Sequence, residues 1–164
     1  MRKEIFPLVG LISTVFGNSI SASSKRASEK GVKASRFGEL FTSSGVVMND
    51  EVHCITFHGG MDLGYLLKIL TGKCLPDTRA GFSELLQIYF PNLYDMKHLM
   101  RFGNGLYGGL KKLAETLGVQ RIGTSHQAGS DSLLTSCTFM KLKGVLAIPI
   151  EKQAGVVFGL GEEG

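Results

Sequence analysis

The segment HQAGSDSLLT, residues 126–135, places a histidine five positions before an aspartate at the start of a predicted helix. An imidazole can carry a proton near neutral pH, and a carboxylate can bind a divalent cation. The small, flexible Gln-Ala-Gly-Ser between them lets both side chains face the same group. The spacing therefore makes His126 a candidate proton carrier and Asp131 a candidate charged ligand.

Asp62 has the same setting as Asp131, because each follows a glycine-containing turn and falls in the first turn of a predicted apolar helix. A carboxylate there can satisfy free N–H groups and complement the helix dipole. The pair can equally be two hard oxygen ligands at one edge of a sheet, with His126 as the base beside a bound water. The residues leave both interpretations open. Ordinary structural roles are expected for the other histidines, His53, His58 and His98.

Two further motifs match known functional patterns, a dinucleotide-binding site and a hydrolase triad, only weakly. Residues 103–108 read GNGLYG, but a dinucleotide site needs a strand directly before it and an acidic residue about 20 positions on. The preceding MKHLMRF is predicted to be helical, and no acidic residue stands at that distance. Ser130 or Ser132 with His126 and Asp131 has the residue types of a hydrolase triad. The G-x-S-x-G elbow is absent, and such close neighbours can hardly face one another across a site.

The bulk composition is that of a single globular domain. The chain has 164 residues, and 43% of them are hydrophobic, which suffices for a core. Its three cysteines form no C-x-x-C pair, which argues against a disulfide framework and a thiolate zinc site and favours a reducing compartment. Residues 1–36 hold seven Lys or Arg against two Asp or Glu, and the remainder is nearly balanced. Charge alone therefore does not indicate a nucleic-acid binder.

The first 28 residues are predicted to be a separate leader without a fold. An apolar run over residues 5–16 follows Arg2 and Lys3, in the outline of a secretory signal. Pro7 and Gly10 interrupt that run, and it is too short for a transmembrane helix. A disordered leader is therefore preferred to a working signal, and the Ser-, Ala- and Lys-rich residues 19–35 are predicted to be a linker.

Alternating strand and helix patterns follow the linker and predict an α/β sheet. A strand is expected over residues 52–57, and a strand or strand-to-helix junction is expected around Asp95. Gly118 stands where a glycine commonly ends a helix. Helices are expected from the segments around Phe37 to Phe41, LGYLLKIL, FSELLQIYF, LKKLAETLG and SDSLLTSCTFMKLK.

From about residue 29 onward the sequence resembles the Caf/Pop deadenylases, most closely their plant members. The matching segments are RFGELFTSSGVVMND, TFHGGMDLGYLLKILTG, FSELLQIYFPNLYDMKHLM, GLYGGLKKLAETLGVQRIG, HQAGSDSLLT and AGVVFGLG. These proteins are DEDD-type nuclease subunits of the carbon catabolite repressor–NOT complex. The resemblance implies an α/β, ribonuclease H-like DEDD exonuclease fold with a mixed sheet flanked by helices, of which residues 29–164 form a partial domain lacking its first strands.

The resemblance also implies a site. In that family four carboxylates from three motifs hold two divalent cations, Mg²⁺ or Mn²⁺, and a histidine assists the attacking water. Asp62 in HGGMDLGYL corresponds to the aspartate of the second motif, and His126 and Asp131 correspond to the histidine and aspartate of the third. The second motif has Gly59, Met61 and Leu63 where the family prefers serine and aromatic residues. These changes keep the ligand but alter the pocket around it.

The family's first motif, D-x-E on a strand, has no counterpart in the chain. No two acidic residues are separated by two positions anywhere in the sequence. On a strand that spacing would aim both carboxylates at the same face, so the expected site holds half of the family's ligands. The loss leaves three hypotheses: a poly(A)-specific exoribonuclease with sharply reduced activity, a non-catalytic binding partner of the complex, and a truncated gene model.

Family resemblance further implies partners and a compartment. The expected substrate is the poly(A) tail of messenger RNA, hydrolysed from the 3′ end. The expected protein partners are a helical scaffold subunit and a second deadenylase subunit, with no membrane association. Nucleus and cytoplasm are the compartments that the family implies.

Overall fold

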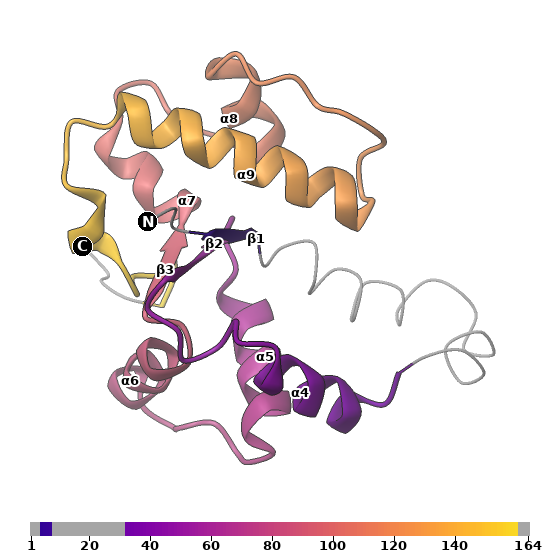
Figure 1. The fold of residues 1–164 in the computed structure, drawn as a ribbon. Helices are drawn as coiled ribbons and strands as arrows, with labels where there is room; N and C mark the ends of the chain where they lie inside the picture. The colour runs from indigo at the N-terminus through magenta and orange to yellow at the C-terminus, as the bar shows by residue number, and fades with distance from the viewer. Residues whose placement is uncertain (1–3, 8–31, 161–164) are drawn as a thin grey trace.

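The computed structural model describes residues 4–7 and 32–160, which are built around a small parallel sheet (Figure 1). Its strands are β1 (Glu4–Pro7), β2 (Val52–Thr56) and β3 (Asn92–Asp95), in the order β1-β2-β3. Both pairings are parallel, so the carboxyl ends of all three strands meet at one edge. That edge is where an open α/β fold places its chemistry.

Helices cover both faces of this sheet. In Figure 1, α4, α5 and α6 lie on one side of the strands, and α8 and α9 lie on the other. Short helical turns α7 and η2 follow β3, and η3 lies near the carboxyl terminus. The bounds are α4 (Ala34–Ser43), α5 (Gly60–Thr71), α6 (Arg79–Tyr89), α7 (Met96–Leu99), η2 (Met100–Phe102), α8 (Leu110–Thr116), α9 (Ala128–Val145) and η3 (Ile150–Gln153).

Two hydrophobic clusters follow from the alternation of side chains along the strands. Cys54 and Leu93 point to one face and pack with α4, α5 and α6. Ile55 and Tyr94 point to the other face and pack with α7, α8 and α9. Both clusters have fully buried residues at their centres, and they hold α5 and α9 against the sheet. These two helices carry the candidate site residues.

The predicted helices and strands are confirmed. In α5, Leu63, Leu66 and Leu67 are the buried stripe that the sequence predicts. Gly118 lies directly beyond α8 with a left-handed φ of 68°, as a glycine at a helix end should. The GNGLYG motif follows helical turns rather than a strand, which excludes a dinucleotide fingerprint there.

The expected α/β fold with helices on both faces is also confirmed. All three strands of the described residues are parallel, so the antiparallel part of the expected mixed sheet is not among them. Within residues 4–7 and 32–160, no helix combines the length and apolarity needed to cross a membrane. Cys54, Cys74 and Cys137 are all free thiols, and burial raises the pKa of Cys54 to about 12.

Strand β1 lies inside the segment predicted to be a disordered leader, so that prediction missed an ordered element. Ile5 and Phe6 have high strand propensity and pair in parallel with His53 and Cys54 of β2, which would otherwise be an edge strand. The rest of residues 1–28 falls outside the described residues, as do the signal-like run beyond Pro7 and most of the predicted linker.

Candidate active site

Asp62 lies in the first turn of α5, two residues after the helix begins at Gly60. The N-cap residue is Gly59, and no side chain caps the helix by a hydrogen bond. Within the described residues, the Asp62 carboxylate has neither a hydrogen-bond nor an ion-pair partner. A hydrogen-bonding cap is therefore not its role, although it still complements the helix dipole.

The surroundings of Asp62 disfavour its charge. Burial raises the pKa of its carboxyl above the ordinary value of 3.8, and the electrostatic effect of the nearby His58 lowers it by less. The residue as a whole is nevertheless exposed to solvent, so its carboxyl is only partly desolvated. A partly desolvated, unpaired carboxylate costs stability, and such groups are characteristic of functional sites.

Replacement of Asp62 by Asn should therefore stabilise the fold at neutral pH. A raised folded-state pKa means that the native chain loses stability as pH rises from 3.8 through the folded pKa. Asn carries no charge, so the gain in unfolding free energy should be present at pH 7 and vanish below the unfolded pKa. Urea unfolding at acidic and neutral pH measures it.

Asp131→Asn is the matched comparison for that experiment, because it should lower the unfolding free energy rather than raise it. It breaks a partly buried ion pair and should cost about 1 kcal/mol at neutral pH. A destabilised Asp62→Asn chain at pH 7 would contradict the assignment of Asp62 as an unpaired, partly desolvated carboxylate.

Asp131 lies in the first turn of α9, where its carboxylate is paired with Arg121. Arg121 Nη1 lies 2.6 Å from Asp131 Oδ1, and the two side chains are only 21% and 17% exposed. The same guanidinium nitrogen donates to Ser130 Oγ at 3.0 Å, and Ser130 Oγ donates to the Ile122 carbonyl at 2.8 Å. These contacts tie the loop before α9 to the first turn of the helix and engage Ser130, one of the two serines of the weak triad motif.

His126 is exposed and lies in the turn that leads into α9. Its φ of 62° lies in the left-handed region, which few non-glycine residues adopt. Gln127 then forms the N-cap of α9 without a side-chain hydrogen bond. A solvent-accessible imidazole on a strained backbone beside a helix start matches a proton carrier better than a core histidine.

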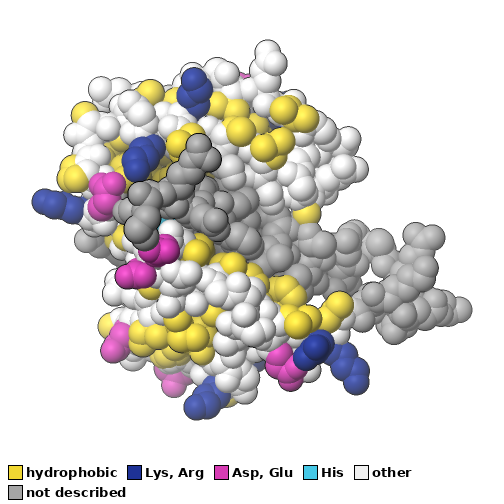
Figure 2. Space-filling model, viewed as in Figure 1, with side chains coloured by type: hydrophobic (Ala, Val, Ile, Leu, Met, Phe, Trp, Pro, Cys, Tyr) yellow, Lys and Arg dark blue, Asp and Glu magenta, His cyan; other side chains and the backbone are white. Residues whose placement is uncertain are grey.

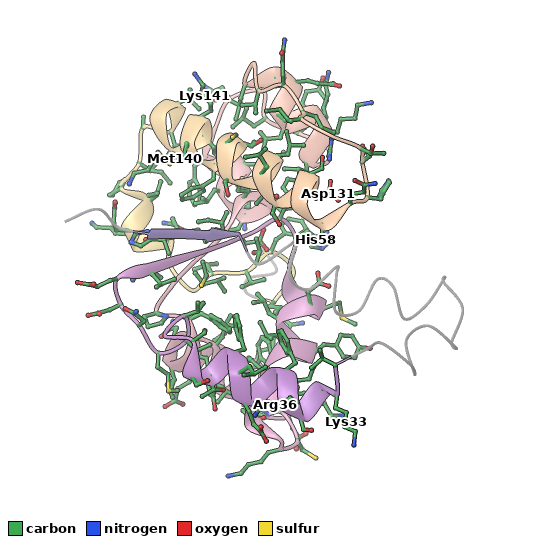
Figure 3. All side chains as sticks on the ribbon, turned by 45° about the vertical axis from the view of Figure 1, so that its right-hand side comes forward. Lys33, Arg36, His58, Asp131, Met140 and Lys141 are labelled. Atoms are coloured by element: carbon green, nitrogen blue, oxygen red, sulfur yellow. The ribbon has the colours of Figure 1, made fainter. Side chains whose placement is uncertain are left out.

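The starts of α5 and α9 lie towards the carboxyl ends of the strands. In Figures 1 and 3 both helices begin on the side of the molecule to which β2 runs, and Figure 3 shows His58 and Asp131 there. Among the described residues, however, no three His, Cys, Asp or Glu groups gather closely enough to hold a metal ion. Asp62, Asp131 and His126 therefore share an edge without converging on one ion.

Strand β1 does not supply the missing ligands at that edge. Its one acidic residue, Glu4, is aligned with Val52 at the amino end of β2, and Pro7 is aligned with Ile55 near the carboxyl end. The carboxylates of Asp62 and Asp131 are suitable donors for Mg²⁺ or Mn²⁺. Their number is too small, so the described residues do not form a metal centre by themselves.

Sequence reasoning assigned no site role to two residues of this region. Arg121, which neutralises Asp131, stands ten positions upstream, in a segment that matches the family but to which the motifs assign no site residue. Asp95 accepts the N–H groups of His58 and Gly59, next to Asp62. Its position between a strand and a helical turn was the only available signal. The structure assigns no contact to His126 that would confirm a catalytic role.

Basic side chains do not form an obvious path for RNA on the visible face. Figure 2 shows Lys and Arg side chains of the described residues as small, separated groups among hydrophobic and acidic ones. Nucleic-acid recognition on that face would therefore not rest on a continuous positive patch.

Comparison with known proteins decides the family. Residues 19–139 match the model of the CAF1 family ribonucleases. The chain belongs to the CAF1 ribonuclease family. The family inferred from the motifs is thus confirmed. Because the match begins at residue 19, inside the predicted leader, the leader boundary at residue 28 stays a prediction.

Two CAF1 relatives illustrate the similarity. The probable CCR4-associated factor 1 homolog 7 of Arabidopsis thaliana is 58% identical over 136 residues, which are 82% of this chain and 50% of that protein. The poly(A) ribonuclease pop2 of Schizosaccharomyces pombe is 43% identical over 119 residues, 73% of this chain and 36% of that protein. The chain thus spans half or less of these relatives' length.

Solved CAF1 structures confirm the ribonuclease H-like fold. The S. pombe Pop2p structure, in a form with bound Mg²⁺ and Mn²⁺, superposes with a TM-score of 0.76 at 36% identity, over 91% of this chain and 58% of that chain. A yeast structure of the NOT1 MIF4G domain crystallised with CAF1 gives a TM-score of 0.69 at 28% identity, over 86% of this chain and 59% of that chain.

Proposed function

We propose that this chain is part of a poly(A)-specific 3′-to-5′ exoribonuclease, a messenger RNA deadenylase of the CCR4–NOT complex. The supporting observation is the placement of Asp62 and Asp131 in the first turns of α5 and α9, at one edge of a CAF1 domain. The poly(A) ribonuclease activity in the name of the S. pombe relative supports the choice of substrate.

In this proposal Asp62 and Asp131 are ligands of divalent cations, Mg²⁺ or Mn²⁺. The S. pombe Pop2p structure with bound Mg²⁺ and Mn²⁺ supports the choice of cations. Such cations stabilise developing negative charge in phosphoryl transfer when bound. His126 is the proposed base, because its exposed imidazole can take a proton from a water molecule at this edge. Since the described residues do not complete the metal centre, the 164-residue chain alone should be a poor catalyst.

Tail preference tests the proposed substrate. The purified chain, at an excess over RNA, should shorten a 5′-labelled RNA ending in oligo(A) stepwise and release adenosine monophosphate. The same RNA ending in an oligo(U) tail of equal length should be shortened about tenfold or more slowly, because a base-specific site distinguishes substrates by such factors. Both reactions should require Mg²⁺ or Mn²⁺.

Equal rates on the two tails, or internal cleavage of the RNA, would contradict a poly(A) exoribonuclease. A folded chain that shortens neither tail would favour a second function, that of a non-catalytic binding subunit. The absence of any D-x-E pair from the sequence and of a three-ligand group from the described residues supports this alternative.

The binding alternative has its own test. The proposed partners are the scaffold subunit and the second deadenylase subunit of the complex. The solved structure of a CAF1 protein with the NOT1 MIF4G domain supports the scaffold as partner. The chain should co-purify with that domain, and failure to do so would remove the alternative. We also propose nuclear and cytoplasmic residence, as the family implies, which microscopy of the tagged chain would test.

A further inference from the structure

A buried carboxylate that the proposed reaction does not use connects three segments of the chain. Asp95 ends strand β3 at the carboxyl edge of the sheet and is 1% exposed. Its Oδ1 accepts the N–H of His58 at 2.8 Å and of Lys97 at 2.9 Å. Its Oδ2 accepts the N–H of Gly59 and of Phe158, each at 3.3 Å.

All four of these donors are backbone groups, and no cation of the described residues pairs with Asp95. A carboxylate that only accepts hydrogen bonds is suited to hold several backbone segments in one arrangement. Only the bond from Lys97 serves as an N-cap, and it caps a helix of four residues. The other three bonds fix the turn after β2 and the carboxyl-terminal segment, so capping α7 does not account for the arrangement.

The carboxyl-terminal segment reaches the same turn through further contacts. Gly155 N–H donates to the Leu93 carbonyl at 2.8 Å, which places the segment beside β3. The rings of His58 and Phe158 meet edge to face, with centroids 5.2 Å apart. Leu160 packs against the first residue of α5, since a Cβ added at Gly60 would lie 3.2 Å from Leu160 Cδ1.

We propose that Asp95 is a positioning residue for the candidate active site, a proposal that rests on the proposed function. By holding the N–H groups of His58 and Gly59, it sets where α5 begins and therefore where Asp62 stands. Through Phe158 it ties that position to the carboxyl-terminal segment. His58 has a φ of 58°, a conformation that a non-glycine residue keeps only when its surroundings impose it.

Asp95→Asn in the full chain tests this proposal. An amide nitrogen cannot accept a hydrogen bond, so two of the four N–H groups lose their acceptor whichever way the amide is turned. Amide hydrogen exchange by NMR should show about tenfold less protection at one of two pairs of amides. The pair is His58 and Lys97 if the amide nitrogen takes the place of Oδ1, and Gly59 and Phe158 if it takes the place of Oδ2. Protection of Leu113 in α8 should not change, and Asp77→Asn, an exposed carboxylate, is the control.

Gly59→Ala perturbs the same turn without touching Asp95. A Cβ at Gly59 would lie 2.7 Å from Thr56 Cβ, and Thr56 is fully buried, so the turn must move. This variant should also lower the protection of His58, whose N–H lies in the same turn. In both variants the single-turnover rate on oligo(A) RNA should fall about tenfold or more with RNA affinity unchanged, because misplaced catalytic groups affect the reaction rather than binding.

A uniform loss of protection that includes Leu113 would overturn the proposal, because it would show a general stabilising role. Unchanged protection at His58 and Gly59 in Asp95→Asn would overturn it as well. If the unmodified chain shows no deadenylation, the proposed function fails, whereas the exchange experiment still decides whether Asp95 positions the turn before Asp62.

Discussion

The 164-residue chain is expected to shorten an oligo(A) tail at least ~10³-fold more slowly than the S. pombe poly(A) ribonuclease pop2. Electrostatic stabilisation of the transition state is commonly the largest catalytic contribution, and loss of a single group can lower a rate ~10²-fold or more. The chain has no D-x-E pair, and its described residues gather no three metal-binding groups. Two carboxylates at the starts of separate helices are too few to bind a divalent cation tightly.

Single-turnover rates of both proteins on the same labelled RNA, with Mg²⁺ and then Mn²⁺, measure this ratio. Circular dichroism and a cooperative urea transition must first show that the chain is folded. A rate within tenfold of the pop2 rate would contradict the expectation, and would mean that another group replaces the missing carboxylates.

The residual deadenylation activity of the chain should depend on Asp62. Asp62→Asn is expected to lower the residual rate ~10²-fold, because it removes one of the two carboxylates at the candidate site while keeping the shape of the side chain. The same substitution should raise stability at neutral pH, since burial raises the pKa of the native carboxyl. Opposite effects on stability and rate are the expected signature of a functional group held at a cost to folding.

Glu84→Gln is the control for that variant. Glu84 is an exposed carboxylate on α6, on a part of the chain that the site does not include. Its removal should leave both the residual rate and the unfolding free energy nearly unchanged. An equal loss of activity in Glu84→Gln would point to a general charge effect rather than a site at Asp62.

The sequence predicts most of the described fold because its signals are local. The stripe of Leu63, Leu66 and Leu67 has helical spacing, and the apolar run at residues 52–57 has the length and composition of a strand. Strand β1 escaped prediction because pairing with β2 decides its conformation. Pro7 and Gly10 nearby argued against regular structure.

The candidate site was predictable in its residues but not in its contacts. Asp62, His126 and Asp131 stand in recognisable motifs, so resemblance could assign them. Arg121 meets Asp131 across a loop, and Asp95 meets Phe158 across 63 positions of sequence. Neither contact leaves a local pattern, because each depends on how separate segments pack at the edge of the sheet.

The most direct test compares the single-turnover rate of adenosine monophosphate release from oligo(A) RNA by the unmodified chain and by Asp62→Asn, at equal enzyme excess and with Mn²⁺. We expect a slow, cation-dependent release by the unmodified chain that Asp62→Asn reduces ~10²-fold in a protein at least as stable. Equal rates in the two proteins would show that Asp62 is not part of the active site and would contradict the proposed deadenylase mechanism.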